Sequence, residues 1–159
     1  MGPVTTHEEP EGQRYGSLLL DEQLCFALYA AQRAVTAAYR PLLDELGLTY
    51  PQYLVMLCLW ERGETTVKDL AGALRLDYGT VSPLLKRLES AGLLRRERSL
   101  RDERSVSVAL TGRGEQLRDR AAAVPTTLAA ATGLDGPEVA RLRAELWELT
   151  AHAAKAAGR

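Results

Sequence analysis

The chain has 159 residues, of which 46% are hydrophobic and 26% charged, and its formal net charge is −1. This length and composition are typical of one globular domain rather than a disordered chain, and they exclude a secreted mini-scaffold. No apolar run reaches the roughly 18 residues of a membrane span, and two cysteines, Cys25 and Cys58, are too few for a disulfide framework. The acidic start lacks the basic flank of a secretory signal, so we expect a cytoplasmic protein.

Basic charge is concentrated in one part of the chain. Residues 81–120 hold ten Lys and Arg against six Asp and Glu, whereas residues 1–64 hold four against nine. A local excess of this kind is expected where one face meets a polyanion such as DNA. A solvated surface of mixed charge gives the same pattern, so charge alone does not decide.

A long amphipathic helix is predicted first. Apolar residues recur at three- and four-residue steps from Ser17 to about Leu46. We expect a kink near Pro41, which has no N–H for the helical ladder, and an end at Gly47.

Two further helices are marked by their N-terminal caps. Thr49 and Gln52 have the spacing of a capping box, which predicts a helix to about Arg62 that is apolar on nearly all sides and therefore belongs to the core. Thr66 followed three residues later by Asp69 predicts a short helix ending near residue 74.

The next helix is expected over residues 78–91, after a tight turn at 76–79. Two short helices joined in this way form a helix-turn-helix. Local rules alone favour a later start, because Ser82 is a good N-cap and Pro83 a good first residue.

A hairpin and two helices complete the chain. Residues 94–99 and 105–110 resemble strands around a polar tip with the sequence LRDER. Thr111 caps a helix that we expect to be interrupted or bent at Pro125, and Asp135 caps a last helix to about residue 153.

This order of elements resembles the winged helix of the MarR (multiple antibiotic resistance regulator) family. The resemblance is carried by LGLTYPQYLVMLCLWERGETTVKDLAGALRLDYGTVSPLLKRLESAGLL and by the wing residues RDER followed by LT. It implies a mainly helical fold with a small β-hairpin wing, Pro83 inside the recognition helix, and a homodimer. Residues 1–16 are then a flexible tail and 17–159 one domain, with dimerisation helices at 17–48 and 112–153 and the DNA-binding winged helix at 49–111.

A narrower resemblance is carried by LLLDEQLCFALYAAQRAVTAAYRPLLDELGLTYPQYL, which is similar to the organic hydroperoxide resistance regulators, the OhrR branch. It implies that Cys25 is the peroxide sensor and that Tyr29, Tyr39 and Tyr50 surround it. No cysteine follows Cys58, so the chain resembles the one-cysteine type. In that type the sulfenic acid forms a mixed disulfide with a small thiol or is overoxidised.

The chemistry explains why these residue types are needed. A thiolate is the form that attacks the O–O bond, and an ordinary thiol with a pKa of about 8.5 is only slightly ionised at neutral pH. Tyrosine hydroxyls can stabilise a thiolate without adding charge. Tyr29 follows Cys25 by one helical turn. Tyr39 follows Cys25 by 14 residues, which is roughly 21 Å along the helix axis. As the resemblance implies, we expect Tyr39 and Tyr50 to reach Cys25 from the partner chain. The alternative for Cys25 is a structural role, because a lone cysteine in a helix is commonly a small buried hydrophobic residue.

The resemblance also assigns the DNA contacts. The recognition helix is expected in the major groove of double-stranded DNA and the wing at the minor groove or its phosphates, with Asp102 orienting a wing arginine. The expected contact residues are Tyr78, Thr80, Ser82, Lys86 and Arg87 on the helix and Arg101, Asp102 and Arg104 on the wing.

Three hypotheses follow. The first is a dimeric repressor that binds a palindromic operator and releases it when an organic hydroperoxide oxidises Cys25. The second keeps the DNA binding but responds to a small aromatic ligand or another oxidant. The third is a thiol peroxidase, which leaves the basic hairpin unexplained, so we expect no enzyme. Neither His7 nor His152 has the spacing of a metal site or a catalytic triad, and we expect no cofactor.

Overall fold

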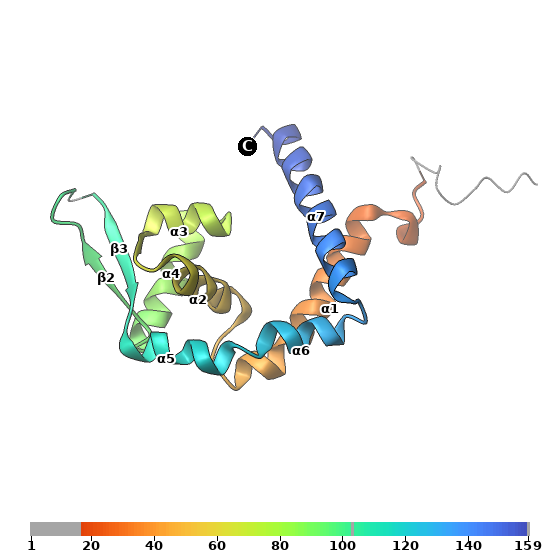
Figure 1. The fold of residues 1–159 in the computed structure, drawn as a ribbon. Helices are drawn as coiled ribbons and strands as arrows, with labels where there is room; N and C mark the ends of the chain where they lie inside the picture. Colours follow the sequence, from red (N-terminus) through yellow and green to blue (C-terminus); the bar gives the residue numbers. More distant parts are fainter. Residues whose placement is uncertain (1–16, 103, 159) are drawn as a thin grey trace, which may run out of the picture. The chain divides into compact units, whose positions relative to one another are not determined.

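The computed structural model describes residues 17–102 and 104–158. The expected tail at 1–16 and the wing-tip residue Glu103 lie outside this range. Two compact units are divided between Ala37 and Ala38. Within the described ranges no helix has both the length and the apolarity to cross a bilayer. The expected fold, mainly helical with a small β-hairpin wing, is confirmed (Figure 1).

The first α-helix begins later than predicted. A short 3-10 helix, η1 (Leu20–Glu22), precedes α1 (Leu24–Asp44), so the start expected at Ser17 is wrong. Gln23 has an extended backbone, with φ −85° and ψ 119°, which breaks the helical ladder. Its side-chain amide donates hydrogen bonds to the carbonyl oxygens of Ser17 at 2.7 Å and Leu19 at 3.0 Å, and these bonds hold the preceding turn in its own shape.

The end of α1 follows the predicted pattern. The helix continues past Pro41 to Asp44, and Gly47 adopts a φ of +69°, which glycine reaches without the strain of a Cβ. The N–H of Leu48 donates to the carbonyl oxygen of Leu43 at 3.0 Å, and that of Gly47 donates to Asp44 at 3.1 Å. This pair of bonds is a Schellman motif, which satisfies the last carbonyls of the helix.

Helix α2 (Tyr50–Arg62) forms the centre of the core. Its predicted capping box is present: Thr49 accepts from the N–H of Gln52, and the side chain of Gln52 accepts from the N–H of Thr49. The buried residues of α2 are Tyr53, Val55, Met56, Cys58 and Leu59.

The helix-turn-helix consists of α3 (Val67–Leu74) and α4 (Tyr78–Ser90). Asp77 caps α4 by accepting from the N–H of Thr80 at 2.7 Å, so the helix begins before Ser82 and contains Pro83. The alternative start with Ser82 as N-cap is therefore wrong, because Asp77 caps the helix five residues earlier.

A three-stranded antiparallel sheet forms the wing. The predicted hairpin is β2 (Leu94–Arg98) with β3 (Val106–Leu110), and it projects beside α3 and α4 (Figure 1). A third strand that the sequence did not predict, β1 (Thr65–Thr66), pairs with the edge of β3 opposite to β2, so β3 is the central strand. A strand of two residues is too short to show the alternation of apolar and polar residues that predicts a strand. It is recognised only by its hydrogen bonds to β3.

Three helices follow the wing: α5 (Gly112–Ala121), α6 (Val124–Ala131) and α7 (Gly136–Ala156). The expected interruption lies just before Pro125, which occupies the first turn of α6, where its missing N–H removes no helical bond. Asp135 and Glu138 form the capping box of α7. No side chain of α7 is fully buried within the described structure.

One junction joins the wing to the core. Thr111, between β3 and α5, donates from its N–H to the carbonyl oxygen of Leu93 at 3.1 Å and from its hydroxyl to that of Gly92 at 2.6 Å. The indole N–H of Trp60 donates to the carbonyl oxygen of Gly114 at 2.9 Å. A Cβ on Gly114 would lie 2.0 Å from the carbonyl oxygen of Leu93, so this position admits only glycine.

We expect Gly114→Ala to lower the free energy of unfolding by about 3 kcal/mol, because the backbone oxygen that it meets cannot turn aside. Gly112→Ala is the matched control in the same helix, since its Cβ meets nothing within 4 Å. Its effect should stay within about 1 kcal/mol. Urea denaturation of both variants measures the difference, and equal stabilities would contradict the close approach at Gly114.

Candidate DNA-binding surface and redox site

Helix α4 has one buried face and one polar face. Val81, Leu85 and Leu88 are buried in the core, and this orientation turns the predicted DNA-contact residues outward. Ser82 is half-buried, and the exposed ones are Tyr78, Thr80, Lys86 and Arg87. The helix-turn-helix therefore presents hydroxyl groups and cations on a surface that the core holds in place.

The described residues near the wing tip are held by hydrogen bonds from backbone N–H groups to side chains. The hydroxyl of Ser99 accepts from the N–H groups of Arg101 and Asp102, and Asp102 Oδ1 accepts from the N–H of Arg104 at 3.0 Å. Arg101 and Arg104 are exposed. Asp102 thus holds the backbone at Arg104, and its role in orienting a wing arginine toward DNA stays a prediction.

A groove of about 330 Å³ lies between α4 and the wing. Tyr78 and Ser82 line it from the helix, and Arg96 and Arg98 line it from β2. The sequence analysis did not name these two arginines as candidate DNA-facing residues. Their spacing of two residues in a predicted strand places them on one face, and this signal could have identified them from the sequence.

Cys25 lies in the unit that ends at Ala37. It occupies the first turn of α1 and is exposed, and Tyr29 follows it by one helical turn. The hydroxyl oxygen of Tyr29 accepts a hydrogen bond from Arg33 Nη1 at 3.4 Å, and the guanidinium lies 5.5 Å from the ring centroid. Because Tyr29 acts as acceptor toward Arg33, its own O–H remains available to donate. The first turn of a helix also favours a negative charge.

Tyr39 and Tyr50 lie in the second unit and form an aromatic cluster there. The centroid of the Tyr39 ring is 5.0 Å from that of Tyr50 and 5.8 Å from that of Tyr53. Burial, and to a smaller extent the neighbouring Tyr50 and Tyr53, raise the pKa of Tyr39 to about 12. Burial also raises the pKa values of Tyr50 and Tyr53. These hydroxyls therefore stay protonated at neutral pH, as hydrogen-bond donors must.

Tyr53 was not among the predicted pocket residues. Its spacing of three residues from Tyr50 on one helix was the available signal. The approach of Cys25 to Tyr39 and Tyr50 across a dimer stays a prediction. Cys58 is buried in α2, and burial raises the pKa of its thiol, as fits a core residue.

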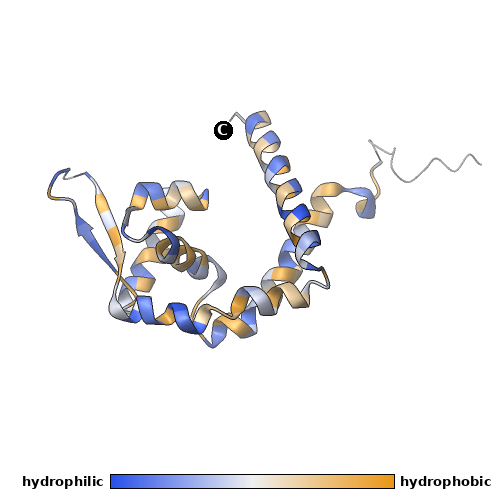
Figure 2. Cartoon of the chain, in the orientation of Figure 1, coloured by the Kyte–Doolittle hydropathy of each residue, from blue (hydrophilic) through white to orange (hydrophobic). Residues whose placement is uncertain are grey.

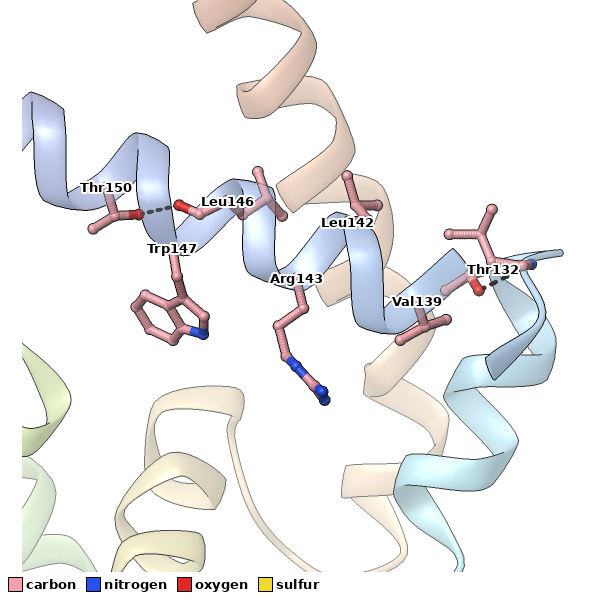
Figure 3. Close-up of a pocket in the computed structure, with 8 residues that line it drawn as sticks. Thr132, Val139, Leu142, Arg143, Leu146, Trp147 and Thr150 are labelled. Carbon is pink, nitrogen blue, oxygen red and sulfur yellow. Dashed lines mark hydrogen bonds between the residues drawn. The ribbon is translucent and has the colours of Figure 1, made fainter. Parts of the chain in front are cut away.

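An open apolar groove of about 520 Å³ runs along α7 (Figure 3). Leu142, Leu146 and Trp147 line it and are 44%, 38% and 55% exposed. Figure 2 shows such apolar positions alternating with polar ones along α7. The guanidinium of Arg75, from the turn before α4, lies 4.9 Å from the centroid of the Trp147 ring.

The tyrosine cluster predicts a loss of stability at alkaline pH. A raised pKa in the folded state means that the contribution of Tyr39 is complete below pH 10.0, its ordinary pKa, and is lost as the pH rises through about 12. Tyrosinate absorbance should show a late ionisation that Tyr39→Phe removes and that Tyr29→Phe, in the other unit, leaves in place. A titration unchanged by Tyr39→Phe would contradict the burial of this hydroxyl.

Comparison with known proteins identifies the family. A MarR family domain matches residues 48–106. The organic hydroperoxide resistance transcriptional regulator of Bacillus subtilis is 44% identical over 136 residues, which are 86% of this chain and 92% of that protein. Two structures of AbfR, a Staphylococcus epidermidis protein, share the fold. The reduced form bound to DNA has 35% identity and a TM-score of 0.70, covering 84% of this chain and 92% of that one. The disulfide form has 33% identity and a TM-score of 0.60, covering 88% and 93%. The chain belongs to the MarR family of DNA-binding transcriptional regulators.

Proposed function

We propose that this protein is a repressor that binds a palindromic operator as a homodimer while Cys25 is reduced and releases it when an organic hydroperoxide oxidises Cys25. The observation that carries the proposal is the exposed thiol in the first turn of α1, with the Tyr29 hydroxyl one turn further. The relative in Bacillus subtilis, a regulator of organic hydroperoxide resistance, supports the choice of oxidant.

The homodimer is supported by apolar side chains that each unit leaves uncovered. In the first unit Leu18 is 98% exposed and Leu24 61%, and in the second the α7 groove exposes Trp147. An exposed apolar groove such as the one along α7 marks an interaction site in a soluble protein. A second copy of the chain supplies matching helices, and a two-fold axis places two recognition helices on two half-sites.

The DNA contacts use the polar face of α4 and the wing. Lys86 and Arg87 approach the major groove, and Arg101 and Arg104 approach the minor groove or its phosphates. Half-sites then lie about one helical turn, roughly 34 Å, apart or at multiples of it.

The sensing step is a two-electron oxidation of sulfur. The Cys25 thiolate attacks the terminal oxygen of the hydroperoxide, an S–O bond forms, and the O–O bond breaks. The alkoxide that leaves takes up a proton and becomes an alcohol, while Cys25 becomes a sulfenic acid. A small thiol then displaces water from the sulfenic acid to form a mixed disulfide, or a second hydroperoxide oxidises it to a sulfinic acid.

The tyrosines give this step its environment. Tyr29 of the same chain and Tyr39 and Tyr50 of the partner donate hydrogen bonds to the thiolate. Their hydroxyls carry no charge, so the pocket stays apolar enough for an alkyl hydroperoxide. Oxidation adds volume and polarity to Cys25. At a dimer interface this change alters the spacing of the two recognition helices.

Cys25→Ser tests the proposal against its alternatives. We expect wild-type protein and Cys58→Ser to bind duplex DNA from the protein's own upstream region and to release it after stoichiometric cumene hydroperoxide. Cys25→Ser should bind the same DNA and stay bound, because serine has no oxidisable sulfur. Electrophoretic mobility shift measures all three, and mass spectrometry of the treated protein identifies the oxidised cysteine.

The other outcomes point elsewhere. Release of Cys25→Ser by the hydroperoxide would overturn Cys25 as the sensor, and a response of this variant to an aromatic ligand would favour the ligand-binding alternative. Sustained consumption of hydroperoxide with a thiol reductant, without any DNA binding, would favour a thiol peroxidase.

A further inference from the structure

The carboxylate of Glu89 joins the recognition helix to the wing. Glu89 stands near the end of α4, and its Oε2 accepts a hydrogen bond from the backbone N–H of Arg96 in β2 at 3.0 Å. Its Oε1 accepts from Arg96 Nη2, also at 3.0 Å. Hydrogen bonds from Arg96 hold the pKa of Glu89 below its usual value, so this carboxylate is ionised at neutral pH. One side chain thus holds both the backbone and the side chain of a strand residue.

This contact lies in the groove between α4 and the wing. Glu89 and Arg96 are both among its lining residues, together with Tyr78, Ser82 and Arg98. Arg96 is neutralised by Glu89, whereas Arg98 has no acidic partner among the described residues. The groove therefore offers one free cation and two hydroxyl groups, a set of donors that suits a phosphate oxygen.

A regulator that places a helix in one groove of DNA and a wing in the next must accommodate the phosphate strand between them. The groove lies between these two elements, with Tyr78 and Ser82 on the α4 side and Arg98 on the β2 side. The base of β2 is held in the core by the buried Leu94, and further along the strand Glu89 is the side chain of α4 that bonds to it.

We propose that the groove between α4 and the wing binds a backbone phosphate of DNA through Arg98, and that Glu89 is a positioning residue that sets the width of this groove through Arg96. The proposal rests on the DNA-binding function but not on peroxide sensing.

The sign of the expected effect separates this role from simple electrostatics. Removing a negative charge from a DNA-facing surface strengthens binding when charge is the whole effect. We expect the opposite for Glu89→Gln, about tenfold weaker binding, because the wing loses its fixed angle. Glu89→Ala should bind more weakly still, since a glutamine oxygen can still accept from the Arg96 N–H.

Glu97 provides the matched control. It lies in β2, as Arg96 does, and forms an ion pair with Arg95 at 3.2 Å. This ion pair stays within β2 and is more exposed than that of Glu89, with the side chain of Arg95 54% and that of Glu97 66% accessible. Glu97→Gln removes the same charge without loosening the wing from α4. It should therefore bind DNA as tightly as the wild type or more tightly.

The experiment uses the full chain and a duplex selected by the wild-type protein from a random pool, with fluorescence anisotropy at several salt concentrations. Arg98→Gln should bind several-fold more weakly and lower the slope of log affinity against log salt by about 1, the value for one lost phosphate contact. Hydroxyl-radical footprints should show that Glu89→Gln loses protection at the outer, wing-contacted positions and keeps it at the centre of each half-site.

The results separate the possible failures. A Glu89→Gln variant that binds as tightly as Glu97→Gln would overturn the proposal, and so would a footprint that weakens uniformly or an unchanged salt slope for Arg98→Gln. A wild-type protein that enriches no duplex would overturn the DNA-binding function itself. Melting temperatures close to that of the wild type are expected for all four variants, and a fall confined to the Glu89 variants that accounts for their lost affinity would assign Glu89 to folding alone.

Discussion

The close approach of α5 to the carbonyl oxygen of Leu93 is the constraint on which the second unit depends. Gly114 permits it by having no side chain, and its own carbonyl accepts the indole N–H of Trp60 from the central helix. Thr111 completes the junction by bonding to Leu93 and Gly92. The base of the wing, the end of the recognition helix and the start of the C-terminal helices are thereby fixed to one core.

In the helix-turn-helix, a buried apolar face holds a polar surface in position. Leu85 and its neighbours turn one face of α4 inward, so Lys86 and Arg87 are exposed on the opposite face. The contact of Glu89 with Arg96 extends this rigidity to the wing. In the proposed complex, helix and wing meet the two grooves of a duplex with little rearrangement, which limits the entropy lost on binding.

In the candidate redox site, a cysteine stands in the first turn of a helix. Cys25 is exposed within its unit, and the hydroxyl oxygen of Tyr29, one helical turn further along α1, accepts from Arg33. Tyr39 is held neutral by its own cluster, with a pKa near 12, and thus has the protonation state of a donor. In the second unit, the contact of Arg75 with Trp147 joins the turn before α4 to α7, the helix whose apolar face a partner chain would cover. In the proposed dimer, these surfaces couple the oxidation of Cys25 to the two recognition helices.

The sequence by itself determined the features that depend on near neighbours. The caps at Thr49 and Asp135 and the interruption before Pro125 follow from side chains within a few residues of the backbone groups that they satisfy. Tertiary structure alone decided the rest. The strand β1 exists only because β3 offers it hydrogen bonds, and the bond from Glu89 to Arg96 depends on how the hairpin returns to the helix. Such contacts join groups that the chain brings together only after it has folded, so no local pattern records them.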